Sequence, residues 1–172
     1  RSPSRGLGDV YKRQANTISD GFYIAEYLKK NFKDYFHTLT TFHTFFEYQD
    51  ENACLQNNCT LIELDNEKSV SQVRYNNRTE IMPFKNQKDL DKYIEARRKF
   101  WSLIKSKTNN LEIKQQSGDM LILDNYRVLH GRTGYKDTEN KRYFRQGYMD
   151  RDILQSKLCL LYTSPSPRDG LL

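Results

Sequence analysis

Three side chains near the C-terminal end of the sequence have the chemistry to bind a small charged ligand together: His130, Arg142 and Tyr148. A neutral imidazole is a common metal ligand. A guanidinium group can hold a carboxylate through two hydrogen bonds, and an aromatic ring can hold an alkylammonium group. Spacing alone leaves two other interpretations open, a hydrogen-bonded structural role for His130 and a core position for Tyr148.

These side chains need strands that bring them to one cavity. The apolar segments 120–124 and 128–130 are predicted to be strands, and Gly131 is expected to end the second one. A last strand is predicted over 142–150. Because residues an even number apart face the same side of a strand, Arg142 and Tyr148 would then point together.

The rest of the chain supplies short strands with helices between them. Apolar residues at three- and four-residue spacing predict a long helix over 89–105, with Trp101 on its core side. Turn-forming residues at 65–68 predict a hairpin. The remaining elements are helices at 20–30, 33–40 and 153–158, and strands at 43–48, 60–64, 69–75 and 112–114. This pattern favours a mainly β barrel or jelly roll with helical inserts.

The two ends of the sequence have a common origin in DNA. A single DNA segment that encodes residues 4–14 on one strand encodes 159–168 on the other. We therefore expect residues 1–14 and 159–172 to be translated sequencing adapter, and we set both segments aside. Residues 15–158 remain as one domain-sized segment, expected to be the C-terminal part of a larger domain.

Charge and cysteine content exclude several classes of protein. The net charge of +6 includes +3 from residues 1–14. The remaining Lys and Arg residues are scattered among acidic ones, so a nucleic-acid partner is not expected. No apolar run reaches membrane-spanning length. Cys54 and Cys59 lack a second cysteine pair for zinc, so we expect two free thiols in a loop and a reducing compartment.

Several ordered segments resemble one enzyme family. The nonapeptide DNYRVLHGR at 124–132 is similar to the distal-histidine motif of the gamma-butyrobetaine and trimethyllysine dioxygenases, which are TauD-like iron oxygenases. The resemblance also includes GYMDRD at 147–152, DGFYIAEYL at 20–28, IELD at 62–65 and VRYNN at 73–77. Together these segments extend over nearly all of 15–158.

The resemblance implies a fold, cofactors and site residues. The fold would be part of a double-stranded β-helix, or jelly roll, and the cofactors Fe(II) and the co-substrate 2-oxoglutarate, with ascorbate as an additional reductant. His130 would be the distal histidine of an iron triad of two histidines and a carboxylate. Arg142 would bind 2-oxoglutarate, Tyr148 the substrate trimethylammonium group and Asn76 the substrate carboxylate. No His-x-Asp or His-x-Glu pair occurs in the sequence, so we expect this chain to be inactive by itself.

The expected activity is hydroxylation of a small zwitterion, gamma-butyrobetaine to carnitine, in the cytoplasm. Trimethyllysine hydroxylation, with a mitochondrial location, is the alternative within the family, and a homodimer is compatible with either. A non-catalytic β-barrel binding module is the alternative of another class. Such a module would need neither His130 nor Arg142.

Overall fold

The computed structural model describes residues 15–83, 86–133 and 145–163. These residues fall into two compact units, one that contains 15–83 and 86–133 and one that contains 145–163, and each is described by itself. Arg142 lies outside the described residues. The candidate histidine belongs to the first unit and Tyr148 to the second.

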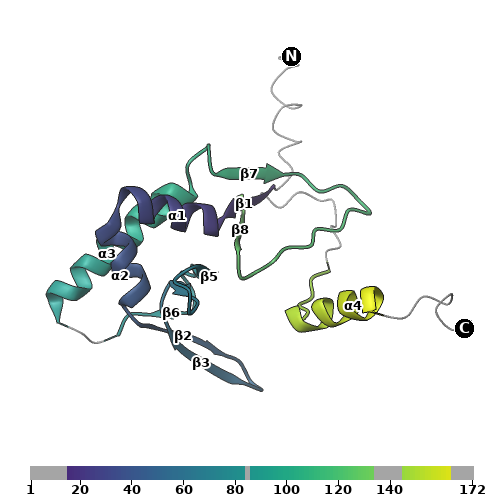
Figure 1. Ribbon diagram of the computed structural model, residues 1–172, viewed down its shortest axis with the longest axis horizontal. Helices are drawn as coiled ribbons and strands as arrows, with labels where there is room; N and C mark the ends of the chain where they lie inside the picture. The colour runs from purple at the N-terminus through teal and green to yellow at the C-terminus, as the bar shows by residue number, and fades with distance from the viewer. Residues whose placement is uncertain (1–14, 84–85, 134–144, 164–172) are drawn as a thin grey trace, which may run out of the picture. The chain divides into compact units, whose positions relative to one another are not determined.

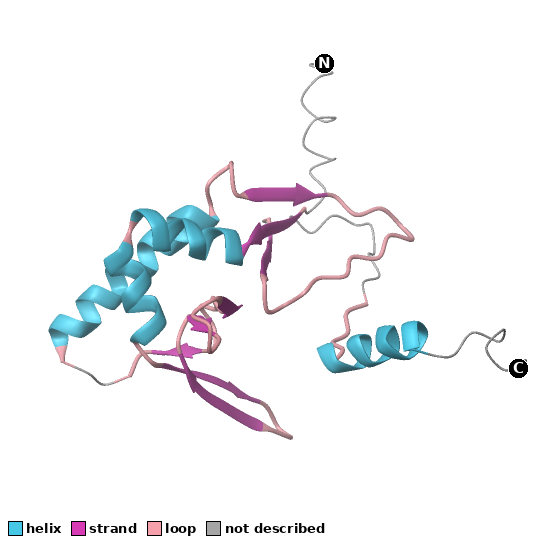
Figure 2. Ribbon diagram, viewed as in Figure 1, coloured by secondary structure: helices cyan, strands magenta, loops and turns pink. Residues whose placement is uncertain are grey.

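Three helices form the largest layer of the first unit (Figure 2). They are α1 (Gly21–Asn31), α2 (Lys33–Thr41) and α3 (Gln87–Ile104). The Asp20 side chain caps α1 and the Asn86 side chain caps α3, since each accepts hydrogen bonds from free amides of the first turn. All three helices were predicted from their apolar residues, and these predictions are confirmed to within a few residues.

The core of the first unit lies between these helices and the hairpin of β4 (Ile62–Leu64) and β5 (Val70–Val73). Helix α3 buries Tyr93, Ala96, Phe100 and Ile104, which recur every three or four residues. Trp101 was expected on that buried face, but 38% of it is exposed and its ring stacks on Tyr75 instead. The other buried apolar residues of the cluster are Ile24, Ala25, Leu28, Phe36, Leu39, Phe42, Leu61, Ile62, Val70 and Val73.

The described strands form three small antiparallel sheets (Figure 1). The first sheet has the order β7-β1-β8, with β1 (Asn16–Asp20) between β7 (Asn110–Ile113) and β8 (Val128–Arg132). The second has the order β3-β2-β6, formed by Cys54–Cys59, Thr44–Gln49 and Glu80–Ile81. The third pairs β4 (Ile62–Leu64) with β5 (Val70–Val73), which confirms the predicted hairpin.

Several expectations for strands were wrong. Residues 120–124 form no strand, and neither do residues 145–150. Gly131 does not end its strand, because β8 continues through Arg132. Cys54 and Cys59 are free thiols as expected, but they are the end residues of β3 rather than part of a loop. The described sheets do not close on one another, and the jelly roll stays a prediction.

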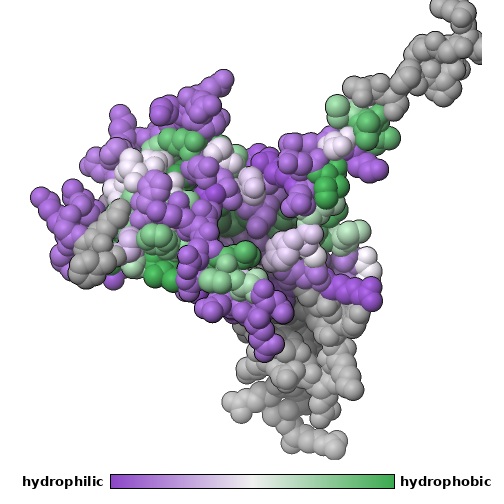
Figure 3. Space-filling model, turned by 90° about the horizontal axis from the view of Figure 1, so that it is seen from below, coloured by the Kyte–Doolittle hydropathy of each residue, from purple (hydrophilic) through white to green (hydrophobic). Residues whose placement is uncertain are grey.

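The second unit contains α4 (Arg151–Thr163), which extends beyond residue 158, the expected end of the domain. Its apolar side chains are exposed, among them Ile153, Leu154 and Leu158. The surface in Figure 3 is mostly hydrophilic, with hydrophobic groups in separate patches. Among the described residues, no helix has the length and apolar character needed to cross a membrane.

Candidate functional site

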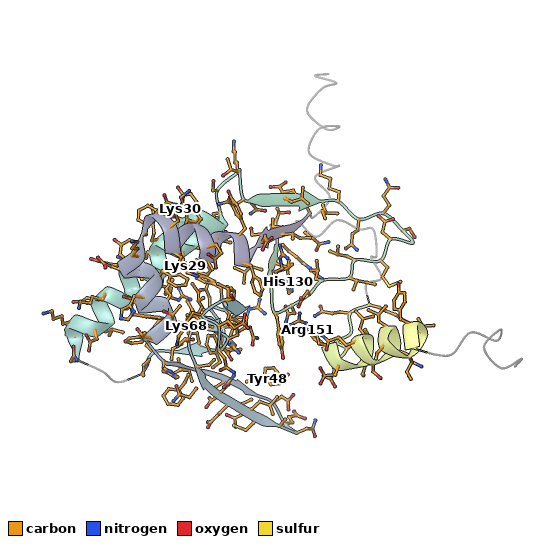
Figure 4. All side chains as sticks on the ribbon, viewed as in Figure 1. Lys29, Lys30, Tyr48, Lys68, His130 and Arg151 are labelled. Carbon is orange, nitrogen blue, oxygen red and sulfur yellow. The ribbon has the colours of Figure 1, made fainter. Side chains whose placement is uncertain are left out.

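His130 lies in the middle of β8, on an exposed part of the first sheet (Figure 4). β8 pairs antiparallel with β1, and His130 is opposite Ile18. In the order β7-β1-β8, β8 is an edge strand, so its other side pairs with no strand among the described residues. The prediction that His130 lies on a short extended segment is confirmed. The imidazole is therefore held by a paired backbone and remains open to a ligand.

A turn at residues 124–127 sets the start of β8. The Asp124 carbonyl accepts hydrogen bonds from the amides of Arg127 (3.1 Å) and Val128 (2.8 Å), and its carboxylate accepts one from the Tyr126 amide at 3.1 Å. The Tyr126 carbonyl accepts a bond from the Val73 amide at 2.9 Å. The segment that precedes His130 is thus tied both to itself and to the end of β5.

The start of α1 is joined to the same turn by Asp20 and Gly21. The Arg127 guanidinium donates to both carboxylate oxygens of Asp20, at distances between 2.6 and 3.2 Å. Its hydrogen bond to the carboxylate is the main cause that lowers the pKa of Asp20. The Gly21 amide donates to the Arg127 carbonyl at 2.9 Å. A Cβ atom on Gly21 would lie 2.7 Å from that carbonyl oxygen, so this close approach requires glycine.

The far end of β8 is held by Ala15 and Thr133. The Thr133 amide donates to the Ala15 carbonyl at 3.0 Å, and the Ala15 amide donates to the Thr133 hydroxyl at 2.9 Å. Between them, Gly131 is opposite Thr17, and an added Cβ would lie 3.0 Å from the Thr17 hydroxyl oxygen. Both ends of the histidine strand are consequently fixed by residues more than a hundred positions earlier in the chain.

Asn76 lies in the 74–79 loop, the irregular segment between β5 and β6, whereas the predicted strand over 69–75 ends at Val73. Its side-chain oxygen accepts hydrogen bonds from the amides of Arg78 (2.8 Å) and Thr79 (3.4 Å). The Asn76 side-chain NH2 group has no partner within the part of the chain that the structure describes. Because Asn76 is exposed, this group offers two donors to a ligand.

Tyr148 is exposed over 82% of its surface, and its hydroxyl accepts a hydrogen bond from the Gln146 side chain at 2.7 Å. A strand over 142–150 was expected to align Tyr148 with Arg142. This prediction is wrong for residues 145–150, which form no strand. The role of Arg142 stays a prediction, and so does the convergence of His130, Arg142 and Tyr148 on one cavity.

A buried ion pair beside the 74–79 loop was missed by sequence reasoning. Arg97 donates to the Glu80 carboxylate from Nε at 2.9 Å and from Nη2 at 2.7 Å. The Glu80 side chain is 1% exposed, and the Tyr93 hydroxyl donates to it as well. Burial, together with this hydrogen bond, raises the pKa of Tyr93. Two charged residues seventeen positions apart carry no pattern that would predict their pairing.

The described residues supply one candidate metal ligand but not a complete site. Within 15–83, 86–133 and 145–163, no three His, Cys, Asp or Glu side chains are grouped as a metal site requires. His37 and His43 are exposed, on α2 and just before β2 respectively. An iron triad that includes His130 would therefore need at least one ligand from outside the described residues.

Comparisons with known proteins match most of the chain. The family model described as taurine catabolism dioxygenase TauD, TfdA family matches residues 15–148. The gamma-butyrobetaine dioxygenase of Homo sapiens is 32% identical over 151 residues, which are 84% of this chain and 38% of that protein. A trimethyllysine dioxygenase of Meyerozyma guilliermondii is 29% identical over 88% of this chain and 38% of its own length. The chain thus spans well under half the length of these relatives.

Proposed function

This chain belongs to the TauD/TfdA family, and we propose on that premise that it is part of an Fe(II)/2-oxoglutarate-dependent dioxygenase that hydroxylates a small trimethylammonium substrate. The observation that carries the proposal is the exposed imidazole of His130, which a doubly anchored edge strand holds. The similarity to gamma-butyrobetaine dioxygenase at 32% identity favours gamma-butyrobetaine as the substrate and carnitine as the product. The similarity to trimethyllysine dioxygenase makes trimethyllysine the second candidate.

Residues 15–158 are, in this proposal, the C-terminal part of a jelly-roll domain, and residues 1–14 and 159–172 are translated adapter. His130 is one iron ligand, and a histidine and a carboxylate from an earlier part of the enzyme complete the triad. Bound iron supplies the activation of dioxygen. Arg142 holds the far carboxylate of 2-oxoglutarate, for which a guanidinium is suited by its paired donors.

Two further residues bind the substrate in this proposal. Asn76 donates its NH2 group to the substrate carboxylate, because its oxygen is already engaged by two backbone amides. The ring of Tyr148 faces the trimethylammonium group, which an aromatic face attracts. Contacts at both ends of a small zwitterion would fix which carbon is presented for hydroxylation. Free cysteines suit a reducing compartment, and we propose either the cytoplasm or the mitochondrion. The proposal also includes a homodimer and a requirement for ascorbate.

The test uses the complete enzyme, by which we mean the protein encoded by the uninterrupted gene that contains residues 15–158. Succinate release should require Fe(II), 2-oxoglutarate and a trimethylammonium substrate together. Mass spectrometry then distinguishes carnitine from hydroxytrimethyllysine as the product. A complete enzyme that binds these substrates without turnover would instead identify a binding module.

Arg142→Ala should strongly raise the concentration of 2-oxoglutarate that the complete enzyme needs for turnover. An unchanged concentration would show that Arg142 does not bind 2-oxoglutarate. Tyr148→Ala should weaken the binding of trimethylammonium substrates more than the binding of uncharged analogues of the same size. The matched control for Arg142 is Arg98→Ala, because Arg98 is an exposed arginine on the outer side of α3.

A further inference from the structure

The Arg97 guanidinium binds the residues on both sides of Asn76. Its Nη1 group donates to the Tyr75 hydroxyl at 3.0 Å, and its Nη2 group donates to the Asn77 side-chain oxygen at 2.7 Å. Asn76 is therefore flanked by two residues that one side chain from α3 holds. A planar guanidinium with several fixed donors can make both contacts at once.

Arg97 is itself fixed by buried partners. Two of its hydrogen bonds go to the Glu80 carboxylate, and the Arg97 side chain is only 18% exposed. Glu80 also accepts a hydrogen bond from Tyr93, whose ring is fully buried and stacks on Phe42 at 4.3 Å. A charged pair that is buried and fully hydrogen-bonded has little freedom to move, because breaking it would leave an uncompensated charge.

An aromatic stack also holds Tyr75, the residue before Asn76. The Tyr75 ring is parallel to the Trp101 ring, with centroids 5.1 Å apart and an interplanar angle of 9°. The Arg97 guanidinium carbon lies 4.4 Å from the Tyr75 ring centroid, within the range of a cation–π contact. Helix α3 thus holds the 74–79 loop through both Arg97 and Trp101.

The anchored loop fixes which end of the Asn76 side-chain amide faces outward. Backbone amides can only donate, so the bonds from Arg78 and Thr79 fix the oxygen inward and the NH2 group outward. A loop that loosened would let the amide rotate and offer an acceptor instead. An outward donor suits an anionic group and disfavours a cationic one.

We infer that Arg97 is a positioning residue that keeps the Asn76 NH2 group directed at the substrate carboxylate, and so sets the preference for carboxylate-bearing substrates. This inference rests on the proposed function of Asn76. It goes beyond that function by assigning the orientation of the Asn76 amide to the buried pair of Arg97 and Glu80. Lysine cannot replace Arg97, because an ammonium group cannot reach Glu80, Tyr75 and Asn77 in one plane.

The first experiment uses the chain itself and needs no substrate. Amide hydrogen exchange, followed by NMR, should be roughly tenfold faster at Arg78 and Thr79 in Arg97→Met, which corresponds to the loss of about one ordinary hydrogen bond. Tyr75→Phe removes one contact and keeps the ion pair, so it should give a smaller change in the same direction even if Arg97→Met folds poorly. Arg98→Met is the matched control and should change neither amide. Unchanged exchange in both test variants would overturn the inference.

The second experiment measures KM in the complete enzyme for the carboxylate substrate and for its neutral amide analogue. Arg97→Met should raise KM for the carboxylate substrate roughly tenfold, with little change for the analogue or in kcat. In the Arg97→Met enzyme, the further substitution Asn76→Ala should raise KM for the carboxylate substrate only a little more, because both residues act through one contact. Additive effects of the two substitutions would overturn the inference.

The two experiments separate the inference from the proposed function. An active enzyme in which Asn76→Ala leaves KM unchanged would remove Asn76 from substrate binding, and the inference would fall with it. An inactive wild-type enzyme would contradict the proposed function, whereas the exchange rates would still decide whether Arg97 holds the loop.

Discussion

Replacing Gly21 with alanine tests the contact between α1 and the segment that leads into β8. An alanine Cβ would lie 2.7 Å from the Arg127 carbonyl oxygen and 3.2 Å from two carbons of Val73. The first distance is shorter than carbon and oxygen tolerate, and the oxygen belongs to the backbone. Val73 is 2% exposed and cannot turn away freely. The backbone at residues 21 and 127 must therefore separate, and the hydrogen bond between them must lengthen.

The expected loss of stability follows from two opposing terms. Overpacking of this kind costs about 1–3 kcal/mol. Alanine also restricts the unfolded chain, which offsets roughly 0.4–1 kcal/mol. Taking the middle of each range, we expect the free energy of unfolding to fall by about 1–2 kcal/mol. With a urea m-value of about 2 kcal/mol per M, the midpoint of unfolding falls by roughly 0.5–1 M.

Urea unfolding of the chain can be followed by the fluorescence of Trp101, the sole tryptophan, which belongs to the same compact unit as Gly21. The matched control is Gly147→Ala, because an added Cβ at Gly147 meets no atom of the described residues within 4 Å. The control should leave the midpoint unchanged. A Gly21→Ala midpoint at or above that of the wild type would refute the close approach of α1 to Arg127.

Three further outcomes are expected from single groups. Asp20→Ala should lower the free energy of unfolding by about 1 kcal/mol through loss of the helix cap, whereas Asp20→Asn should retain the cap in urea unfolding at neutral pH. The hydrogen bond from Arg127 lowers the pKa of Asp20, so the stability that this carboxylate contributes is present above the ordinary pKa of 3.8 and is lost as the pH falls toward the folded-state pKa; acid titration of Asp20→Asn should lack that loss. Tyr93→Phe should cost about 1–2 kcal/mol in the same assay, because Glu80 loses a buried hydrogen bond. Burial raises the pKa of Cys59, so its thiol should react with an aromatic disulfide reagent more slowly than the two exposed thiols, and equal rates would contradict this.

The helices and the hairpin were predictable because their signals are local. Asp20 precedes a helical apolar pattern and caps it, and residues 65–68 carry turn chemistry between two short apolar runs. Strand β1 was missed, because Asn16–Asp20 has no alternating apolar pattern. Its pairing partners in β7 and β8 are about a hundred residues later in the sequence.

In the candidate site, too, local signals predicted some features, whereas contacts between separate elements determine the others. The position of His130 on an extended segment followed from the apolar residues before it and is confirmed. The loop conformation of Asn76 did not follow, because Arg97, Asn77 and Glu80 determine it through contacts between separate elements. Trp101 fits the periodicity of α3, yet its ring covers Tyr75 at the surface, since Ala96 and Phe100 already fill the buried face.

The central claim is that His130 binds iron, and Fe(II) affinity measures it most directly. In the complete enzyme, titration with Fe(II) under anaerobic conditions should give one bound iron per chain. His130→Ala should abolish this binding, and His43→Ala, which replaces an exposed histidine beside β2, should leave it unchanged. Iron bound with equal affinity and stoichiometry in His130→Ala would contradict the account.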